Sequence, residues 1–210
     1  MRIIDLTQTL KAGIRGFSAE PAKSIEKDGW NALTLHIYSH SATHVDAQPH
    51  FNAGNKGIDQ MPVEDFIADC WVIDLTGIAP KTSITVSHLG PVAEKLKPQE
   101  GLLLKTGWAK HILDMEVYRN GLPRLSEELV MWCIEKGVKL IGVEPPSVAD
   151  VTHMEELTHI HQLLLKAGIT IVEGLVNLEK IQTEKVQFFA LPLKIENGDG
   201  APCRAIAIEY

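Results

Sequence analysis

Four residues in the first quarter of the chain have the types and spacing of a metal site. His40, His44, Asp46 and His50 form the pattern H-x-x-x-H-x-D-x-x-x-H within the segment SHSATHVDAQPHF. Imidazole and carboxylate groups suit zinc, manganese or iron(II). Two histidines and one aspartate leave coordination positions free for water and substrate, which is typical of catalytic sites. The alternative is a histidine-rich polar loop that holds no metal.

The spacing of this cluster favours a strand that bends. Counted from His40, the other three residues lie at offsets of 4, 6 and 10, so on a regular strand all four side chains point to one face. On a helix, Asp46 would leave the face shared by His40 and His44. A straight strand of ten residues spans roughly 33 Å, too far for the four groups to meet. We therefore expect a bend. The residues that permit it are Ser39, Ser41, Ala42 and Pro49.

His161 and Glu173 are two further candidates for this chemistry. His161 interrupts the apolar stripe of a predicted helix, and Glu173 lies in the apolar segment ITIVEGLV. A buried carboxylate is costly unless it is paired or bound to a metal. The chain reverses at Gly168 and the next strand returns beside the helix, so both side chains can face one cleft. The alternatives are a core histidine with satisfied hydrogen bonds and a glutamate that points to solvent past Gly174.

The elements that must position these residues alternate along the chain. Alternating or continuous apolar runs predict strands at 2–7, 31–38, 71–75, 102–106, 139–143, 169–173, 186–195 and 204–208. Start and stop signals predict helices at 87–96, with an interruption at Pro91, and at 126–136 and 154–167. The four central runs, from 71 to 173, are short and mostly apolar, which indicates strands buried on both faces. We expect an α/β or α+β fold with a mixed sheet in a single domain of residues 1–210.

Composition excludes several classes of protein. The chain has 210 residues, of which 45% are hydrophobic and 22% charged, as in ordinary globular proteins. Its net charge of −7 argues against nucleic acid as a partner. No apolar run approaches the ~18 residues that span a bilayer, so we expect no membrane association. The N-terminal segment lacks the apolar core of a secretory signal, and we expect a cytoplasmic protein.

These segments together resemble the metal-dependent cyclase-type hydrolases, which include bacterial kynurenine formamidase and isatin hydrolase. HSATHVDAQPH is similar to the family signature H-x-G-T-H-x-D-x-P-x-H. IIDLTQTL resembles the opening strand, LLLKTGW the central strand and turn, and GVEPPSVAD a loop rich in proline and serine. HQLLLKAGITIVEGLVNL, residues 161–178, resembles the second metal block. The resemblance implies a swivelling β/β/α domain that forms a homodimer or homotetramer.

The resemblance also implies roles for the candidate residues. His40, His44 and Asp46 would hold one divalent metal, Zn²⁺ or alternatively Mn²⁺. Asp46 and Glu173 would bridge to a second ion completed by His161, so that one or two ions bind. His50 would donate and accept the proton.

Three positions depart from the family pattern. Ala42 stands where the signature has glycine, and the signature proline is displaced by one residue to Pro49. Phe17, in the segment GFSAEP, is the nearest counterpart of a tryptophan that contacts substrate in the formamidases. Ala42 and Pro49 can alter the bend that brings the ligands together. Phe17 can alter which substrate is accepted.

The function implied by this resemblance is hydrolysis of a small amide of the aryl formamide type. Metal-bound hydroxide would attack the carbonyl group, and His50 would protonate the leaving nitrogen. Histidine suits this step because its ordinary pKa is near neutrality. Two alternatives stay open: ring opening of a cyclic amide, as in isatin hydrolase, and a non-catalytic binder of metal or small ligand on the same scaffold.

Overall fold

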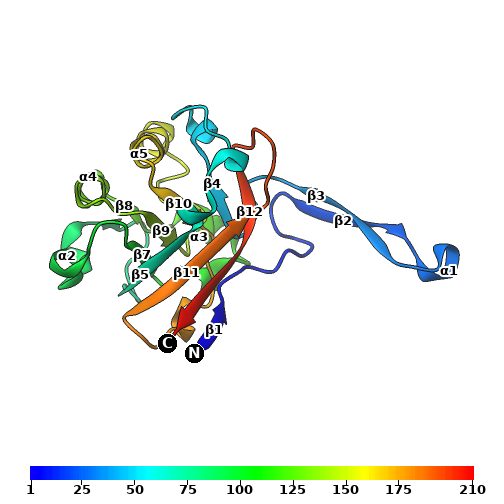
Figure 1. The fold of residues 1–210 in the computed structure, drawn as a ribbon, viewed down its shortest axis with the longest axis horizontal. Helices are drawn as coiled ribbons and strands as arrows, with labels where there is room; N and C mark the ends of the chain where they lie inside the picture. The colour runs from blue at the N-terminus through cyan, green and yellow to red at the C-terminus, as the bar shows by residue number, and fades with distance from the viewer.

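The computed structural model describes all residues from Met1 to Tyr210, and its centre is a mixed sheet. The sheet has eight strands in the order β1-β12-β11-β5-β7-β9-β10-β4, and β4 also pairs with β12 (Figure 1). This extra pairing closes seven strands into a ring. The strands are β1 (Arg2–Asp5), β4 (His44–Asp46), β5 (Ile67–Asp74), β7 (Gly101–Lys105), β9 (Leu140–Val143), β10 (Thr170–Glu173), β11 (Lys185–Pro192) and β12 (Gly200–Glu209).

The mixed sheet confirms the predicted fold class. Four neighbouring strands, β5, β7, β9 and β10, run parallel, and all other pairs in the sheet are antiparallel. The predicted central strand alternates between two cores: Leu103 belongs to the core inside the ring, while Leu102 and Leu104 face the helices. Both faces of this strand are therefore buried, as its uninterrupted apolar sequence predicts.

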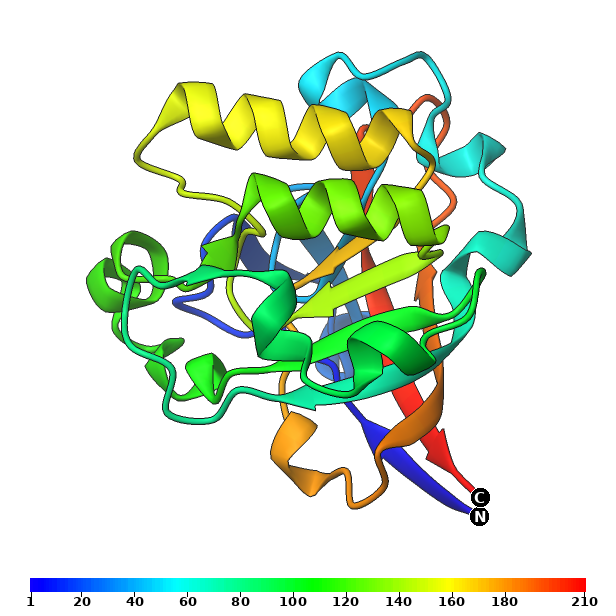
Figure 2. The same ribbon diagram turned by 90° about the vertical axis from the view of Figure 1, so that its left-hand side faces the viewer.

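Two helices, α4 (Glu127–Lys136) and α5 (Met154–Lys166), cover one face of the sheet (Figure 2). The Ser126 hydroxyl accepts a hydrogen bond from the Leu129 N–H at the start of α4, and Gly137 ends that helix with φ at +68°. The predicted helix 87–96 is interrupted, as its sequence indicates. Gly90 and Pro91 divide it into a 3₁₀ turn, Val86–Leu89, and one α-helical turn, α2 (Val92–Lys95).

Short elements complete the fold. Helix α3 (Met115–Asn120) lies beside the sheet, and β6 (Ser83–Ile84) pairs with β8 (Arg124–Leu125). The remaining 3₁₀ turns are Gln48–Phe51, Ile58–Gln60, Val63–Phe66, Trp108–His111 and Leu178–Lys180. None of the helices combines the length and the apolar character needed to cross a membrane.

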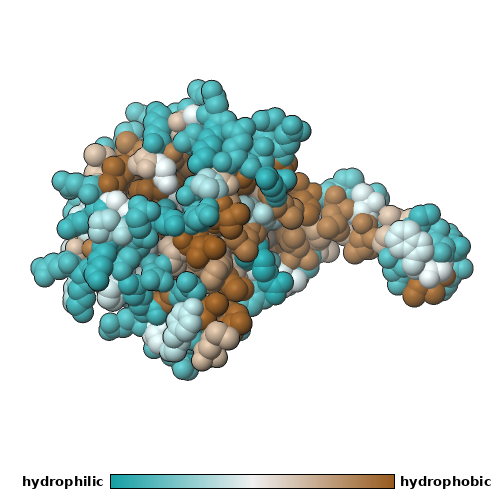
Figure 3. Space-filling model, in the orientation of Figure 1, coloured by the Kyte–Doolittle hydropathy of each residue, from teal (hydrophilic) through white to brown (hydrophobic).

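A β-hairpin extends away from the body of the molecule (Figure 1). It consists of β2 (Phe17–Lys23), the single helical turn α1 (Ile25–Asp28) and β3 (Ala32–Ile37), and we call it the arm. The strand predicted at 31–38 is thus confirmed, but its own chain does not cover its apolar face. Leu33 and Leu35 are 63% and 51% exposed, and brown, apolar side chains follow the arm to its base (Figure 3).

Candidate metal centre and substrate cavity

The short strand β4 brings the two halves of the site together. It lies between β10 and β12, and the register places Glu173 opposite His44 and Gly200 opposite Asp46. His161 reaches the same place from α5, which packs over the sheet. Residues more than 100 positions apart in the sequence therefore meet at one end of the ring.

The bend expected within the histidine cluster is present. Only His44–Asp46 is extended, and His50 follows in the 3₁₀ turn Gln48–Phe51. Ala42 has φ at +55°, in the left-handed region that favours glycine. This turn brings His40 back toward the strand, where its Nδ1 lies 2.9 Å from Asp46 Oδ1. The His50 ring stacks on the His40 ring with centroids 3.6 Å apart.

Two glycines make room for this turn. Gly174 has φ at +69°, and a Cβ on it would overlap the carbonyl oxygen of Ala42. A Cβ on Gly200 would lie 2.7 Å from Cε1 of His40. Larger residues at either position would push the histidine turn away from β4.

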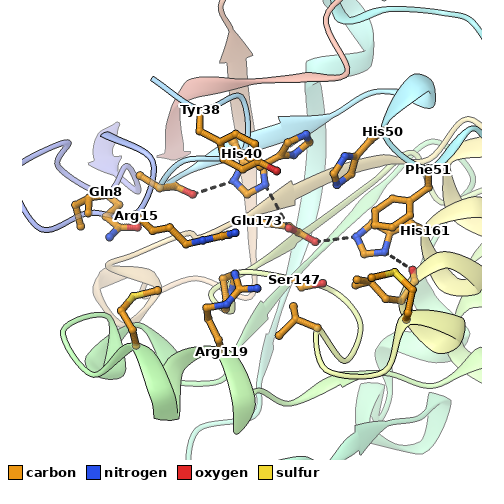
Figure 4. A pocket seen from close by; sticks show the side chains of 18 residues that line it. Gln8, Arg15, Tyr38, His40, His50, Phe51, Arg119, Ser147, His161 and Glu173 are labelled. Carbon is orange, nitrogen blue, oxygen red and sulfur yellow. Dashed lines mark hydrogen bonds and ion pairs between the residues drawn. The ribbon is translucent and has the colours of Figure 1, made fainter. Parts of the chain in front are cut away.

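Asp46 and Glu173 are buried side by side among three imidazole rings. The Nε2 atom of His44 lies 3.5 Å from Asp46 Oδ1 and 3.3 Å from Glu173 Oε2. The Nε2 atom of His161 lies 3.3 Å from Glu173 Oε1 and 3.6 Å from Asp46 Oδ2. Glu173 is only 4% exposed, so it does not point to solvent, which was the alternative that the sequence left open. One of the dashed lines in Figure 4 joins Glu173 to the His161 ring.

This donor set fits a divalent cation. Oδ2 of Asp46 is buried and has no hydrogen-bond partner, which is costly unless a cation or water satisfies it. Ligand atoms of His44, Asp46 and Glu173 all lie within 4.8 Å of one another, and so do those of His40, Asp46 and His50. Imidazole nitrogens and carboxylate oxygens in this number are typical ligands of zinc and manganese.

Backbone groups orient the side chains toward the centre. Nδ1 of His44 lies 2.9 Å from the Ala42 carbonyl oxygen, and Nδ1 of His161 lies 2.7 Å from that of Leu157. These contacts leave both Nε2 atoms directed at the carboxylates, as in metal sites whose histidines are fixed by outer hydrogen bonds. The Val148 N–H, from the loop GVEPPSVAD, donates to Glu173 Oε1 at 2.8 Å.

The charges in the cluster shift the pKa values of its members. Burial opposes protonation of His44, but its hydrogen bond to Glu173 and the charge of Asp46 raise its pKa to about 9. Burial acts to raise the pKa of Asp46, yet the hydrogen bond from His40 and the neighbouring histidines hold it well below its usual range. In the metal-free protein a proton therefore occupies His44 at neutral pH, and metal binding has to displace it.

His50 differs from the other histidines of the cluster. Burial and the nearby charge of His40 lower its pKa, against the opposing effect of Asp46, so its imidazole is neutral at pH 7. Its side chain is 21% exposed, and its Nδ1 lies 3.8 Å from an Asp199 oxygen. Asp199 also lies 3.2 Å from Nε2 of His40. Sequence reasoning did not single out Asp199, whose signal is an acidic residue between Gly198 and Gly200.

A cavity of about 320 Å³ opens onto the cluster. Its walls come from β4, β10, α3, α5, the 3₁₀ turn Gln48–Phe51 and three loops. They include His40, His44, His50, His161 and Glu173 (Figure 4). Phe17 does not line it. That residue begins β2 and pairs with Ile37, whereas Ile14 and Arg15, three and two residues before it, line the cavity. Sequence reasoning missed other lining residues: Gln8, Arg15, Tyr38, Arg119 and Ser147.

Comparison with known proteins places these features in a family. Residues 4–150 match the Cyclase family model, whose description reads "Putative cyclase". The chain is 30% identical to the kynurenine formamidase of Erythrobacter litoralis over 99% of its own length and 94% of that protein. It is 32% identical to the kynurenine formamidase of Bacillus thuringiensis, over 97% and 95% of the two chains.

Solved structures show the same fold. Isatin hydrolase A from Labrenzia aggregata, with benzyl benzoate bound, superposes with a TM-score of 0.88 at 25% identity. The match covers 98% of this chain and 93% of that one. Isatin hydrolase A from Ralstonia solanacearum superposes with a TM-score of 0.87 at 24% identity, over 98% and 91% of the two chains.

Proposed function

Since the chain belongs to the cyclase family, we propose that it is a metal-dependent hydrolase that cleaves the C–N bond of a small, non-peptide amide, with aryl formamides as the first substrate class. The observation that carries this proposal is the unpartnered, buried Oδ2 of Asp46. It lies 3.6 Å from Nε2 of His161, in a carboxylate whose other oxygen lies near His40 and His44, beside a cavity. Kynurenine formamidases related to this chain over nearly its whole length support the choice of substrate class.

The residues that would hold the metal are those of the buried cluster. His40, His44 and Asp46 would hold one ion, and Glu173 and His161 would complete a second with Asp46. A divalent cation, when bound, polarises a carbonyl group and lowers the pKa of water toward 7. Zinc is the first candidate and manganese the second, because both take imidazole and carboxylate ligands.

His50 is the residue that we propose to move the proton. Its neutral imidazole accepts a proton from the attacking water and returns it to the leaving nitrogen as the C–N bond breaks, which releases the carboxylic acid and the amine. Asp199, 3.8 Å from Nδ1, stabilises the cationic form that exists between these two steps. The stack on His40 fixes the plane of the ring.

Ring opening of a cyclic amide is the second candidate. The likeness to isatin hydrolase A at 25% identity and a TM-score of 0.88 favours it. Both reactions break an amide C–N bond next to an aromatic ring, so the same residues would serve either. A cavity of about 320 Å³ is near the lower limit of ligand pockets, which favours substrates with one or two rings.

Release of formate from formanilide, measured beside the opening of isatin, tests the proposal. We expect no turnover after removal of metal, and recovery when Zn²⁺ or Mn²⁺ is restored. His161→Ala should lose activity, whereas the exposed His159→Ala, two residues away on α5, should retain it. If the metal-loaded protein leaves amides and lactams intact, the site is a binder without catalysis and the proposal is wrong.

We also propose that two copies associate through their arms. One face of the arm is apolar on both strands, with Phe17 opposite Ile37 and Ala19 opposite Leu35. An isolated hairpin of two strands is at best marginally stable in water, so this face needs a cover. A groove of about 540 Å³ at the base of the arm, lined partly by Leu191 and Leu193, supplies apolar surface beside it. Because each copy carries both surfaces, a two-fold dimer buries them reciprocally.

A further inference from the structure

Two arginines of the cavity have no carboxylate partner in the chain. The protein has five arginines. The three outside the cavity each pair with an acid: Arg2 with Glu209, Arg124 with Glu156 and Arg204 with Asp5. Arg15 and Arg119 both line the cavity, and the neighbouring acid Glu173 accepts its hydrogen bonds from His161 and Val148 instead.

The two guanidinium groups reach the cavity from separate elements. Arg15 lies just before β2, and Arg119 lies in α3; in Figure 4 both side chains extend toward the middle of the cavity, on the side of Glu173 away from His50. The Tyr38 ring lies 5.7 Å from the guanidinium carbon of Arg15, which favours this position. The Ser41 hydroxyl donates to the Arg15 carbonyl at 3.1 Å and ties its backbone to the histidine turn.

Two cations that face one cavity repel each other unless an anion lies between them. Burial and the charge of Arg15 lower the pKa of Arg119, which reflects this repulsion. Guanidinium groups bind carboxylates through two parallel, charge-assisted hydrogen bonds. Arg119 is half-buried and Arg15 is exposed. An anionic ligand would therefore find both attraction and directed donors here.

We infer that Arg15 and Arg119 bind a carboxylate on the part of the substrate that does not react, so that the cavity selects anionic amides over neutral ones. The inference rests on the proposed hydrolase function. The reacting amide lies at the histidine cluster, and the carboxylate lies across the cavity between the two arginines. A neutral lactam offers nothing to these groups and leaves both cations unpaired.

A series of aryl formamides tests this selection. The substrates are formanilide and the three formamidobenzoates with the carboxylate at ring position 2, 3 or 4. We expect at least one formamidobenzoate to have a kcat/KM about 10- to 100-fold above that of formanilide, the usual size of a charged hydrogen bond. Arg15→Gln and Arg119→Gln should bring this ratio toward 1, mainly through KM. Arg2→Gln, on the edge strand, removes the same charge elsewhere and should leave the ratio unchanged.

Two outcomes overturn the inference. One is a formanilide kcat/KM equal to or above that of every formamidobenzoate. The other is an equal loss on neutral and anionic substrates in Arg15→Gln and Arg119→Gln, which would mean that the arginines stabilise the reacting group or the fold.

Calorimetric titration of the metal-loaded protein with the three aminobenzoates and with aniline separates this inference from the proposed function. If the wild-type protein hydrolyses no amide but binds an aminobenzoate tightly, and Arg15→Gln and Arg119→Gln both lose that binding, the anion site is supported and the proposed hydrolase function is contradicted. Hydrolysis of amides with no preference for substrates that carry a carboxylate would support the hydrolase function and contradict the anion site.

Discussion

Glu173 is a charged residue at the end of an apolar strand, and its burial links the two halves of the site. We predict that Glu173→Gln lowers the number of metal ions bound per chain and reduces turnover with it. Glutamine keeps the shape of the side chain but removes the charge that offsets the cations. Elemental analysis at equal protein concentration measures the metal, and the exposed Glu155→Gln is the control. Equal metal content and equal rates in Glu173→Gln would show that Glu173 is not a ligand.

His50 is the member of the cluster with the lowered pKa and partial exposure, which suits proton transfer better than metal binding. We predict that His50→Asn keeps its metal and loses turnover by about 10²- to 10⁴-fold, the usual contribution of one general acid–base group. Steady-state rates and metal content of the same preparation check this. Loss of metal instead would make His50 a ligand, since its ring lies close enough to His40 and Asp46 to share an ion.

The sequence predicted the position of the cluster better than that of its surroundings. Even spacing placed His40, His44 and Asp46 on one side of a bent strand, and the structure brings all three together. Arg15 and Arg119 come from a loop and a short helix with no periodic pattern, so nothing in their local sequence signals the cavity. Asp199 has only a weak signal, its position between two glycines. The roles of the cluster residues as ligands stay predictions until a metal is located.

The turn between β3 and β4 carries the clearest local strain in the site. Ala42 adopts φ of +55°, a conformation that costs roughly 1 kcal/mol for any residue with a Cβ. We predict that Ala42→Gly raises the free energy of unfolding by about 0.5–1 kcal/mol and retains activity. Urea denaturation of the metal-free protein measures it. Ala167→Gly, at φ of −76° on the exposed end of α5, should destabilise by a similar amount. If Ala42→Gly and Ala167→Gly both lower the free energy of unfolding, the backbone at Ala42 is not strained and the prediction is wrong.

At the scale of elements, sequence patterns predicted the strands of the main sheet and the helices α4 and α5. They missed strand β2 and helix α3, and they did not show what each element packs against. Strands β7, β9 and β10 are buried on both faces, as their apolar composition predicts. Strand β5 is buried only in part, with Trp71 and Val72 half-buried and Asp74 exposed. The strand of the arm shows the same apolar alternation as a core strand, because alternation records only that one face avoids water. Which surface covers that face depends on contacts distant in sequence or, as we propose for the arm, on contacts with a second copy of the chain.

The whole molecule is built as a ring of strands with one projecting arm, and this shape leads to a prediction about assembly. We predict that the wild-type protein has about twice the 23.2 kDa mass of one chain, and that Leu33→Ser combined with Leu35→Ser yields monomers. Light scattering after size-exclusion chromatography measures the mass. Leu113→Ser, at an exposed position outside the arm, is the control. A monomeric wild type, or a dimer that persists in the double variant, would contradict the arm as the interface.

The central claim, that the buried histidines and carboxylates form a metal centre, is tested most directly by anomalous X-ray diffraction from crystals grown with Zn²⁺ or Mn²⁺. We predict a peak at the end of the cavity, about 2.0–2.2 Å from the nearest imidazole nitrogens and carboxylate oxygens. Oδ2 of Asp46 should be among these ligands, since it has no other partner. A peak elsewhere on the protein, or none within reach of Asp46 and Glu173 in metal-loaded crystals, would contradict the account.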